Sequence, residues 1–227
     1  ELEEIFNDFQ EDSNAWVAII TGAGERAFSA GNDLKYQAAG GDRSGMPETG
    51  FGGLTSRFNL NKPVIAAVNG VAMGGGMEIA LACDLIIASS NARFALPEPK
   101  VGLAALAGGM QRLPRQIGMK HAMGMMLTGR HVGANEAKEL GIVNEVVENQ
   151  ADLMDAARNW AKQIEACSPM SIRATKQVAY ESLNEASLEK SLQSGQYTAV
   201  LDLIKSEDFI EGPLAFSEKR APNWKGK

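Results

Sequence analysis

The chain has 227 residues, of which 44% are hydrophobic and 22% are charged, and its formal net charge is −6. This composition is typical of a soluble globular protein with one large domain, or with a domain and an appendage, and not of a disordered chain. The negative charge argues against a general nucleic-acid binder, and the longest apolar runs are far shorter than a membrane span, so we expect neither nucleic acid nor membrane as a partner.

The two cysteines, Cys83 and Cys167, indicate no disulfide framework. This favours a reducing compartment, and we expect the bacterial cytoplasm, or else the mitochondrial matrix. No signal peptide is visible, but the chain opens in the middle of a pattern, so this absence says nothing about targeting.

The first predicted elements are an amphipathic helix over residues 1–9 and a buried strand over residues 16–21. Residues 22–27 (Gly-Ala-Gly-Glu-Arg-Ala) follow the strand and match the dinucleotide-binding pattern G-x-G-x-x-A. Three features disfavour a cofactor site there. Gly31 would interrupt the helix that should follow the glycines, and a polar glycine-rich stretch (residues 38–45) stands where a second strand should end. In addition, no tyrosine has a lysine four residues later, which is the pair that short-chain dehydrogenases share.

Residues 27–31 loosely resemble the nucleophile elbow of a serine hydrolase. Such an enzyme needs a histidine base, and His121 and His131 are the only histidines. We prefer a tight turn at Gly31 that exposes the N–H of Asn32. Residues 40–53 predict a mobile surface loop of the kind that walls a site, and residues 55–59 a short helix.

A glycine-rich junction follows the predicted buried strand 63–68. Residues 74–76 are all glycine, so a ligand can approach the backbone, and free N–H groups at a helix start favour negative charge. Glu78 follows Gly75 by three residues, about one helical turn. We predict an oxyanion hole with an acid/base beside it. The alternative is that the glycines only permit tight packing and Glu78 is a solvated carboxylate.

Two further strands are predicted at residues 84–88 and 92–95, before Glu98. Prolines on both sides of Glu98 favour a stiff, extended backbone that can aim its carboxylate, and the alternative is a turn with a solvated glutamate. A helix is predicted from about Met110. Its further methionines, which we assign to the core, are Met119, Met123, Met125 and Met126.

The rest of the chain is predicted to be a helix over 133–141, a strand over 142–147 and then helices alone. Residues 151–166 form the first of these helices, and Ser168 with Pro169 begins a second that ends near residue 182. Asn184 and Ser206 are the predicted caps of a third and a fourth. Alternating strands and helices followed by helices predict an α/β core with a helical appendage.

Six runs of residues, taken in this order and at this spacing, match motifs of a known protein family. They are residues 27–35 (Ala-Phe-Ser-Ala-Gly-Asn-Asp-Leu-Lys), 63–70 (Pro-Val-Ile-Ala-Ala-Val-Asn-Gly), 74–78 (Gly-Gly-Gly-Met-Glu), 94–98 (Phe-Ala-Leu-Pro-Glu), 108–113 (Gly-Gly-Met-Gln-Arg-Leu) and 211–220 (Glu-Gly-Pro-Leu-Ala-Phe-Ser-Glu-Lys-Arg). Together they resemble the crotonase (enoyl-CoA hydratase/isomerase) family over nearly the whole chain. The last run also looks like that of carnitinyl-CoA dehydratases.

The resemblance implies an α/β fold of the ClpP/crotonase type, a spiral of ββα turns. It implies that residues 1–166 form the spiral core with the acyl-CoA site and that residues 167–227 form a helical oligomerisation region. Members of the family build homotrimers that commonly pair into homohexamers. The coenzyme A thioester is then the substrate, and no separate cofactor or metal is expected.

The resemblance also assigns roles to residues. The thioester oxygen is expected between the N–H groups of Asn32 and Gly75, and Glu78 and Glu98 match the two catalytic glutamates. The residues that match the coenzyme A-binding positions are Ser29, Ala30, Asn32, Leu34 and Lys35, with Phe216 and Lys219 reaching the coenzyme A of a neighbouring subunit. Leu106 stands where many hydratases have a glycine near the catalytic water, so it is expected to narrow the acyl pocket or displace that water.

The chemistry of hydration agrees with these roles. Addition of water to a 2-enoyl-CoA puts negative charge on the thioester oxygen, and two N–H donors stabilise it by roughly 3 kcal/mol each. Water loses a proton and the α-carbon gains one, so two carboxyl groups suffice. We expect hydration of 2-enoyl-CoA to 3-hydroxyacyl-CoA. The alternatives are a Δ3-Δ2-enoyl-CoA isomerase or another crotonase-fold acyl-CoA enzyme, and an inactive oligomeric protein that binds coenzyme A or serves as a scaffold.

Overall fold

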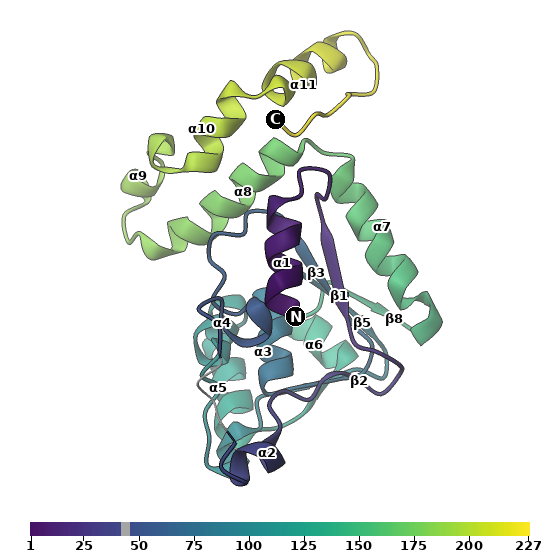
Figure 1. Ribbon diagram of the computed structural model, residues 1–227, viewed down its shortest axis with the longest axis vertical. Helices are drawn as coiled ribbons and strands as arrows, with labels where there is room; N and C mark the ends of the chain where they lie inside the picture. The colour runs from purple at the N-terminus through teal and green to yellow at the C-terminus, as the bar shows by residue number, and fades with distance from the viewer. Residues whose placement is uncertain (42–45) are drawn as a thin grey trace. The chain divides into compact units, whose positions relative to one another are not determined.

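The computed structural model describes residues 1–41 and 46–227 (Figure 1). The predicted loop over 40–53 falls partly on residues 42–45, which lie outside the described residues. The chain forms two compact units, of which unit 1 comprises Glu1–Phe9, Ile19–Phe58 and Val64–Asn159. Unit 2 comprises Gln10–Ala18, Asn59–Pro63 and Trp160–Lys227. The division between residues 166 and 167 stays a prediction.

The described strands form two four-stranded sheets. The first has the order β1 (Ala18–Thr21), β3 (Val64–Val68), β5 (Leu85–Ser89) and β8 (Glu145–Val147). The second has the order β2 (Ala27–Ser29), β4 (Val71–Met73), β6 (Arg93–Ala95) and β7 (Val132–Gly133). Each successive pair, β1–β2, β3–β4 and β5–β6, therefore gives one strand to each sheet, so the chain advances through both sheets together.

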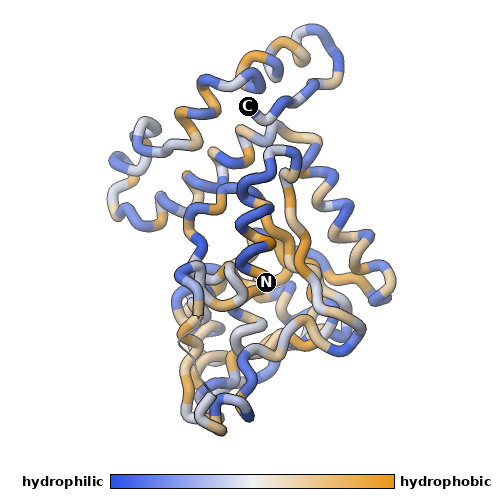
Figure 2. The backbone as a smooth tube through the Cα atoms, viewed as in Figure 1, coloured by the Kyte–Doolittle hydropathy of each residue, from blue (hydrophilic) through white to orange (hydrophobic). Residues whose placement is uncertain are grey.

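The strands of the first sheet hold much of the core. All five residues of β3 are buried, and β3 pairs in parallel with β5, Ile65 opposite Leu85. Figure 2 shows these strands among the hydrophobic parts of the chain. A strand buried on both faces needs a continuous apolar run, which is why it was predictable. The prediction that residues 16–21 form a buried strand is wrong in its burial, because β1 lies at the sheet edge and is partly exposed.

Asn69, at the turn between β3 and β4, binds the loop that matches the dinucleotide pattern. Its side chain is 4% exposed, donates to the carbonyl oxygens of Gly22 and Gly24 at 3.1 and 2.8 Å, and accepts from the Gly22 N–H at 3.1 Å. Strand β2, and no helix, follows this loop. Gly22 therefore serves a tight backbone approach, because a Cβ on it would lie 2.1 Å from the Ala27 carbonyl oxygen.

Helices α1–α6 follow the predictions in part. They are α1 (Leu2–Glu11), α2 (Leu34–Ala38), α3 (Gly75–Ala82), α4 (Gly109–Gln116), α5 (Met119–Thr128) and α6 (Ala134–Leu140), with short 3-10 helices η1 (Phe51–Gly53) and η2 (Glu98–Val101). The single helix predicted from Met110 is wrong, because the chain breaks at Gly118. Met125 is fully buried, but Met119 and Met123 are exposed, so the assignment of the methionines to the core is only partly right.

Two more predictions are wrong. Residues 55–59 form turns and no helix, after the short 3-10 helix η1, in which Gly52 and Gly53 have positive φ values. The long helix expected after Asn184 is split, because Ser187 caps a short helix and another begins only at Thr198.

The later helices are η3 (Gln150–Asp152), α7 (Leu153–Glu165), α8 (Pro169–Glu181), η4 (Ser182–Asn184), α9 (Leu188–Ser191), η5 (Ser194–Gln196), α10 (Thr198–Lys205) and α11 (Glu207–Ser217). The Ser168 and Ser206 hydroxyls accept the predicted capping bonds at α8 and α11. None of the described helices has the length and apolar character that crossing a membrane would require.

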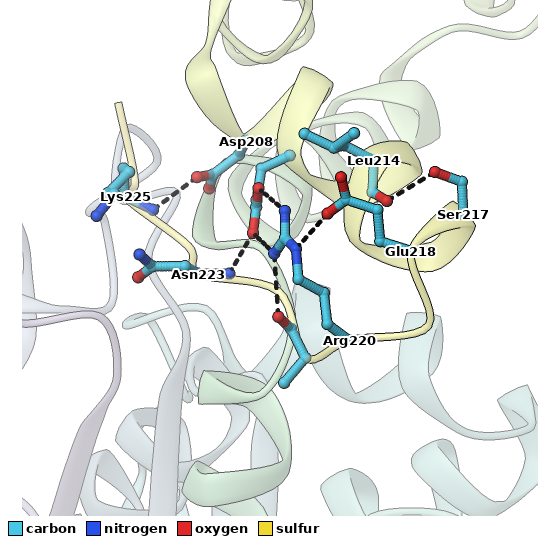
Figure 3. Close-up of polar contacts among 9 residues, drawn as sticks. Asp208, Leu214, Ser217, Glu218, Arg220, Asn223 and Lys225 are labelled. Atoms are coloured by element: carbon cyan, nitrogen blue, oxygen red, sulfur yellow. Dashed lines mark hydrogen bonds and ion pairs between the residues drawn. The ribbon is translucent and has the colours of Figure 1, made fainter.

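The C-terminal tail in unit 2 is held by acidic side chains of α11 (Figure 3). Asp208 is 3% exposed and accepts from the Lys225 N–H at 2.7 Å. Glu211 accepts two bonds from Arg220 and one from the Asn223 N–H. The hydrogen bonds from Arg220, and next the bond from the Asn223 N–H, lower the pKa of Glu211 to about 2, so its carboxylate stays charged in acid that would protonate an ordinary glutamate.

Candidate active site

A pocket of about 490 Å³ lies in unit 1, a volume within the usual range of small-molecule sites. Its walls come from the segment after β2, from η1, from the start of α3 and from η2 with the residues that follow. Six of the predicted site residues line it: Ala30, Asn32, Leu34, Gly75, Glu78 and Glu98. Neither histidine is among its described lining residues, so the serine-hydrolase alternative has no base there.

Two backbone donors open onto this pocket. Gly75 is the first residue of α3, where N–H groups have no partner within the helix. Gly31 has φ +82°, and a Cβ on it would lie 2.8 Å from the Gly75 nitrogen, so the turn before Asn32 touches the start of α3. Within residues 1–41 and 46–227, neither the Asn32 N–H nor the Gly75 N–H donates a hydrogen bond. The pair is suited to an oxyanion.

Glu78 lies on the same helix, one turn after Gly75, and only 4% of it is exposed. Its Oε1 accepts a hydrogen bond from the Gly109 N–H at 2.9 Å. Burial raises the pKa of Glu78, and the charge of Glu98 raises it further, whereas the N–H groups of Gly109 and Ala107 lower it. The solvated-carboxylate alternative for Glu78 is therefore wrong.

Glu98 opens the 3-10 helix η2. The prediction of an extended backbone is wrong, because Pro97 (φ −84°, ψ 5°) caps the turn and Pro99 falls at its second position, where a missing N–H is tolerated. Burial raises the pKa of Glu98, and its own N–H lowers it. Its Oε2 is buried and has no hydrogen-bond partner among the described residues. A buried oxygen of this kind calls for a ligand or a water.

The two carboxylates and the glycine backbone are close together. A Cβ on Gly74 would lie 3.0 Å from the Glu98 Oε1, so the carboxylate of Glu98 faces the residue before Gly75. The charge of Glu98 acts on Glu78 across the same pocket. Two acids with raised pKa values beside two free N–H groups make an arrangement that can exchange protons with a bound carbonyl compound.

The other predicted residues have varied positions. Ser29 lies in β2, and its hydroxyl accepts from the Gly31 N–H at 3.2 Å. Lys35 is exposed in α2. Phe216 and Lys219 belong to unit 2, where Phe216 is 87% exposed and Lys219 is the one described non-glycine residue with a positive φ. Their contacts with coenzyme A stay predictions.

Three further lining residues bear on the shape of the pocket, and two of them, Tyr36 and Phe51, were not predicted. Leu106, which was expected to narrow the acyl pocket, does line it, and its side chain is 76% exposed. Tyr36 and Phe51 also line the pocket, and a Cβ on Gly75 would come within 2.6 Å of the Phe51 ring. Tyr36 lies in the short helix α2 and Phe51 in the 3-10 helix η1. A single aromatic residue in so short an element shows no periodicity, so only the tertiary structure identifies it as a pocket residue.

Comparisons with known proteins found similar sequences and similar folds. The model of the family described as enoyl-CoA hydratase/isomerase matches residues 1–227. A carnitinyl-CoA dehydratase of Escherichia coli O157:H7 is 49% identical over 100% of this chain and 88% of the relative. An enoyl-CoA hydratase structure from Mycobacterium tuberculosis H37Rv covers 100% of this chain and 87% of its own, with a TM-score of 0.91 and 39% identity. A carnitinyl-CoA hydratase structure from Mycobacterium avium, with the same coverage, has a TM-score of 0.74 and 41% identity.

Proposed function

Because the chain belongs to the enoyl-CoA hydratase/isomerase family and has the crotonase fold, we propose that it adds water reversibly to 2-enoyl-CoA thioesters to give 3-hydroxyacyl-CoA. The observation that carries this proposal is the pairing of Glu78 with Glu98 in a pocket that also contains the free N–H groups of Asn32 and Gly75. A conjugated thioester needs an oxyanion site and two proton-transfer groups, and this pocket supplies both.

The proposed steps use these groups as follows. The thioester oxygen accepts hydrogen bonds from Asn32 and Gly75, which stabilise the negative charge that develops there. A water adds its oxygen to the β-carbon and gives a proton to an ionised carboxylate, while a carboxylic acid gives a proton to the α-carbon. The buried, unpartnered Oε2 of Glu98 is the natural contact for the water. Mutual repulsion favours one ionised and one protonated glutamate.

Substitution of each glutamate tests the proposal. E78Q and E98Q keep the shape of the side chain but cannot exchange protons, so each is expected to lower kcat for hydration of crotonyl-CoA by about 10²-fold to 10⁴-fold. The loss of absorbance of the conjugated thioester measures the rate. E25Q changes an exposed glutamate and is the matched control. Near-normal hydration by both pocket variants would contradict the assignment.

A second candidate substrate is favoured by the 49% identity to a carnitinyl-CoA dehydratase. Carnitinyl-CoA is itself a 3-hydroxyacyl thioester, so its dehydration uses the same proton transfers in reverse. Its quaternary ammonium suits aromatic faces, and Tyr36 and Phe51 line the pocket. A kcat/KM for carnitinyl-CoA well above that for 3-hydroxybutyryl-CoA would favour this candidate, and the opposite ranking would exclude it.

The alternatives from the sequence predict different products. A Δ3-Δ2 isomerase would convert 3-enoyl-CoA to 2-enoyl-CoA without hydration, and an inactive scaffold protein would only bind the thioester. The pairing of buried Glu78 with half-buried Glu98 favours a hydratase over both. Incubation with 2-enoyl-CoA and with 3-enoyl-CoA, followed by chromatography of the thioesters, distinguishes the three.

The proposal extends to coenzyme A and to assembly. The residues proposed to hold coenzyme A are Ser29, Ala30, Asn32, Leu34 and Lys35, with Phe216 and Lys219 from a neighbouring subunit. The thioester is the substrate, so the reaction as proposed uses no separate cofactor. The assembly is proposed to be a homotrimer or a homohexamer.

A further inference from the structure

Arg112 lies on α4, the helix whose first N–H faces Glu78. Gly109 begins α4 and donates to the Glu78 Oε1 at 2.9 Å. The Arg112 N–H donates to the Gly108 carbonyl oxygen at 2.8 Å, which closes the first turn of this helix. Arg112 is thus one helical turn away from the donor that contacts the candidate acid/base.

The side chain of Arg112 turns back over the start of its own helix. A Cβ on Gly108 would come within 2.1 Å of the Arg112 Nη1, and Gly108 has φ +103°. No side chain fits at position 108 while the guanidinium lies there. The glycine therefore leaves room for Arg112 to fold against the backbone that carries the N–H groups of Ala107 and Gly109.

The same guanidinium reaches the segment that follows η1, a 3-10 helix whose Phe51 and Gly52 line the pocket. Its Nη2 donates to the Thr55 carbonyl oxygen at 2.8 Å, and its Cζ lies 5.9 Å from the centre of the Phe58 ring. The Thr55 N–H in turn donates to the carbonyl oxygen of Phe51, which lines the pocket. Arg112 therefore joins the segment around η1 to the start of α4.

We propose that Arg112 is a positioning residue, whose side chain ties the start of α4 to the segment after η1 and so keeps the Gly109 and Ala107 N–H groups on the Glu78 carboxylate. Its planar fork suits this task, because one guanidinium can bond a carbonyl oxygen and stack on a ring at once. Its positive charge also favours the ionised form of Glu78.

The charged groups that act on Glu78 in the described structure are Glu98, from η2, and Arg112, from α4. Burial and the Glu98 charge raise the pKa of Glu78, while the two N–H groups and Arg112 lower it. Substitution of Arg112 removes one interaction that lowers the pKa of Glu78, and it weakens the other two, which are the hydrogen bonds from the Gly109 and Ala107 N–H groups. The pKa of Glu78 is then expected to rise, so that a larger fraction of this side chain is protonated at a given pH.

The direct test does not depend on catalysis. Protein labelled with ¹³C at the glutamate carboxyl carbon is titrated by NMR, and E78Q identifies the Glu78 signal by its loss. R112Q is expected to move the Glu78 titration to higher pH, and R112K, which keeps the charge but not the fork, to move it less. R115Q is the matched control, because Arg115 lies on the same helix, is exposed and bonds only the Gln111 carbonyl oxygen among the contacts described.

The activity test rests on the proposed function. If Glu78 must be ionised in the free enzyme, the fall of kcat/KM toward low pH starts at higher pH in R112Q, and kcat/KM near neutral pH drops on the order of 100-fold. R112K should recover part of this loss, and R115Q should match the wild type. Circular dichroism measures whether each variant is folded. If R112Q is unfolded, the test uses the smaller shift of the Glu78 titration that is expected in R112K.

The outcomes separate this inference from the proposed function. An unchanged Glu78 titration in folded R112Q, or in R112K when R112Q does not fold, overturns the role of Arg112 even if hydration is observed. A shifted titration in a protein that hydrates no enoyl-CoA supports the role of Arg112 and overturns the proposed function.

Discussion

At the scale of single residues, the pocket depends on backbone positions that leave no room for a side chain. Gly31 is the clearest case, since its φ is +82° and a Cβ there would lie 2.8 Å from the Gly75 nitrogen and 3.0 Å from the Met73 carbonyl oxygen. A side chain at this position must therefore push the chain before Asn32 away from the start of α3. The spacing of the two proposed oxyanion donors, the N–H groups of Asn32 and Gly75, follows from this glycine.

G31A tests this dependence. The substitution is expected to cost about 1–2 kcal/mol for the positive φ, and also to lower kcat on the order of 100-fold through displaced donors. G24A is a matched control, because Gly24 has φ +72° but nothing lies within 4 Å of its Cβ position. Both variants should therefore lose stability in denaturant unfolding, G31A more because its Cβ also meets backbone atoms, while only G31A loses hydration. Equal activity of the two variants would contradict the geometry.

The candidate site was partly predictable at this scale. Glu78 after a glycine run and Glu98 between prolines stood out as carboxylates at constrained backbone positions, and the structure places both in one pocket. Arg112 was visible only as a member of a familiar run. Its contacts with Thr55 and Phe58 join residues more than 50 positions apart, and local sequence patterns contain no information about such distances.

At the scale of elements, local signals succeeded where a cap or a long apolar run was present. Ser168 with Pro169 begins α8 and Ser206 begins α11, as their side-chain bonds to backbone N–H groups require. Strands β4 and β7 were missed, because two or three residues are too few to show alternation. Their pairing with β6 is a tertiary contact.

The last helix, α11, allows a test of how the C-terminal tail is held. Asp208, on α11, accepts from the Ser168 hydroxyl at 2.9 Å and from the N–H groups of Lys225 and Gly226 at 2.7 and 3.2 Å. Hydrogen bonds to a charged group are worth roughly 1.5–3 kcal/mol each. D208A is therefore expected to lower the free energy of unfolding on the order of 3 kcal/mol.

Hydrogen exchange localises this effect, because the amides of Lys225 and Gly226 should lose protection in D208A. E218A is the control, since Glu218 makes a partly exposed ion pair with Arg220, of a kind typically worth about 0–1 kcal/mol. Unchanged protection of the tail in D208A would show that Asp208 does not hold it.

At the scale of the whole molecule, the family resemblance supplied what local patterns did not. The alternation of strands between two sheets follows from contacts such as Ile65 with Leu85 and Val71 with Arg93, and no propensity specifies which sheet a strand joins. The α/β class and the helical C-terminal part were predictable from the order of the elements. The spiral came from the six matching runs, and the structural neighbours confirm it.

The exposed apolar side chains of α10 and α11 bear on the assembly of the whole molecule. Five large apolar side chains of these helices are between 45% and 87% exposed: Ile204, Phe209, Ile210, Leu214 and Phe216. Ile210 and Leu214 are four residues apart and share one helix face. Exposed apolar side chains gathered on neighbouring helices are typical of an interface, which agrees with the proposed homotrimer or homohexamer.

I210E tests whether this face is an interface. A glutamate buried there without a partner destabilises the contact, so sedimentation velocity is expected to show smaller species than for the wild type at equal concentration. T175E adds the same charge at an exposed polar position of α8 and should leave the size unchanged. A monomeric wild type would overturn the proposed assembly, and an I210E protein of wild-type size would show that this face lies outside the interface. A smaller I210E species with retained hydration would further show that the pocket works without the neighbouring subunit.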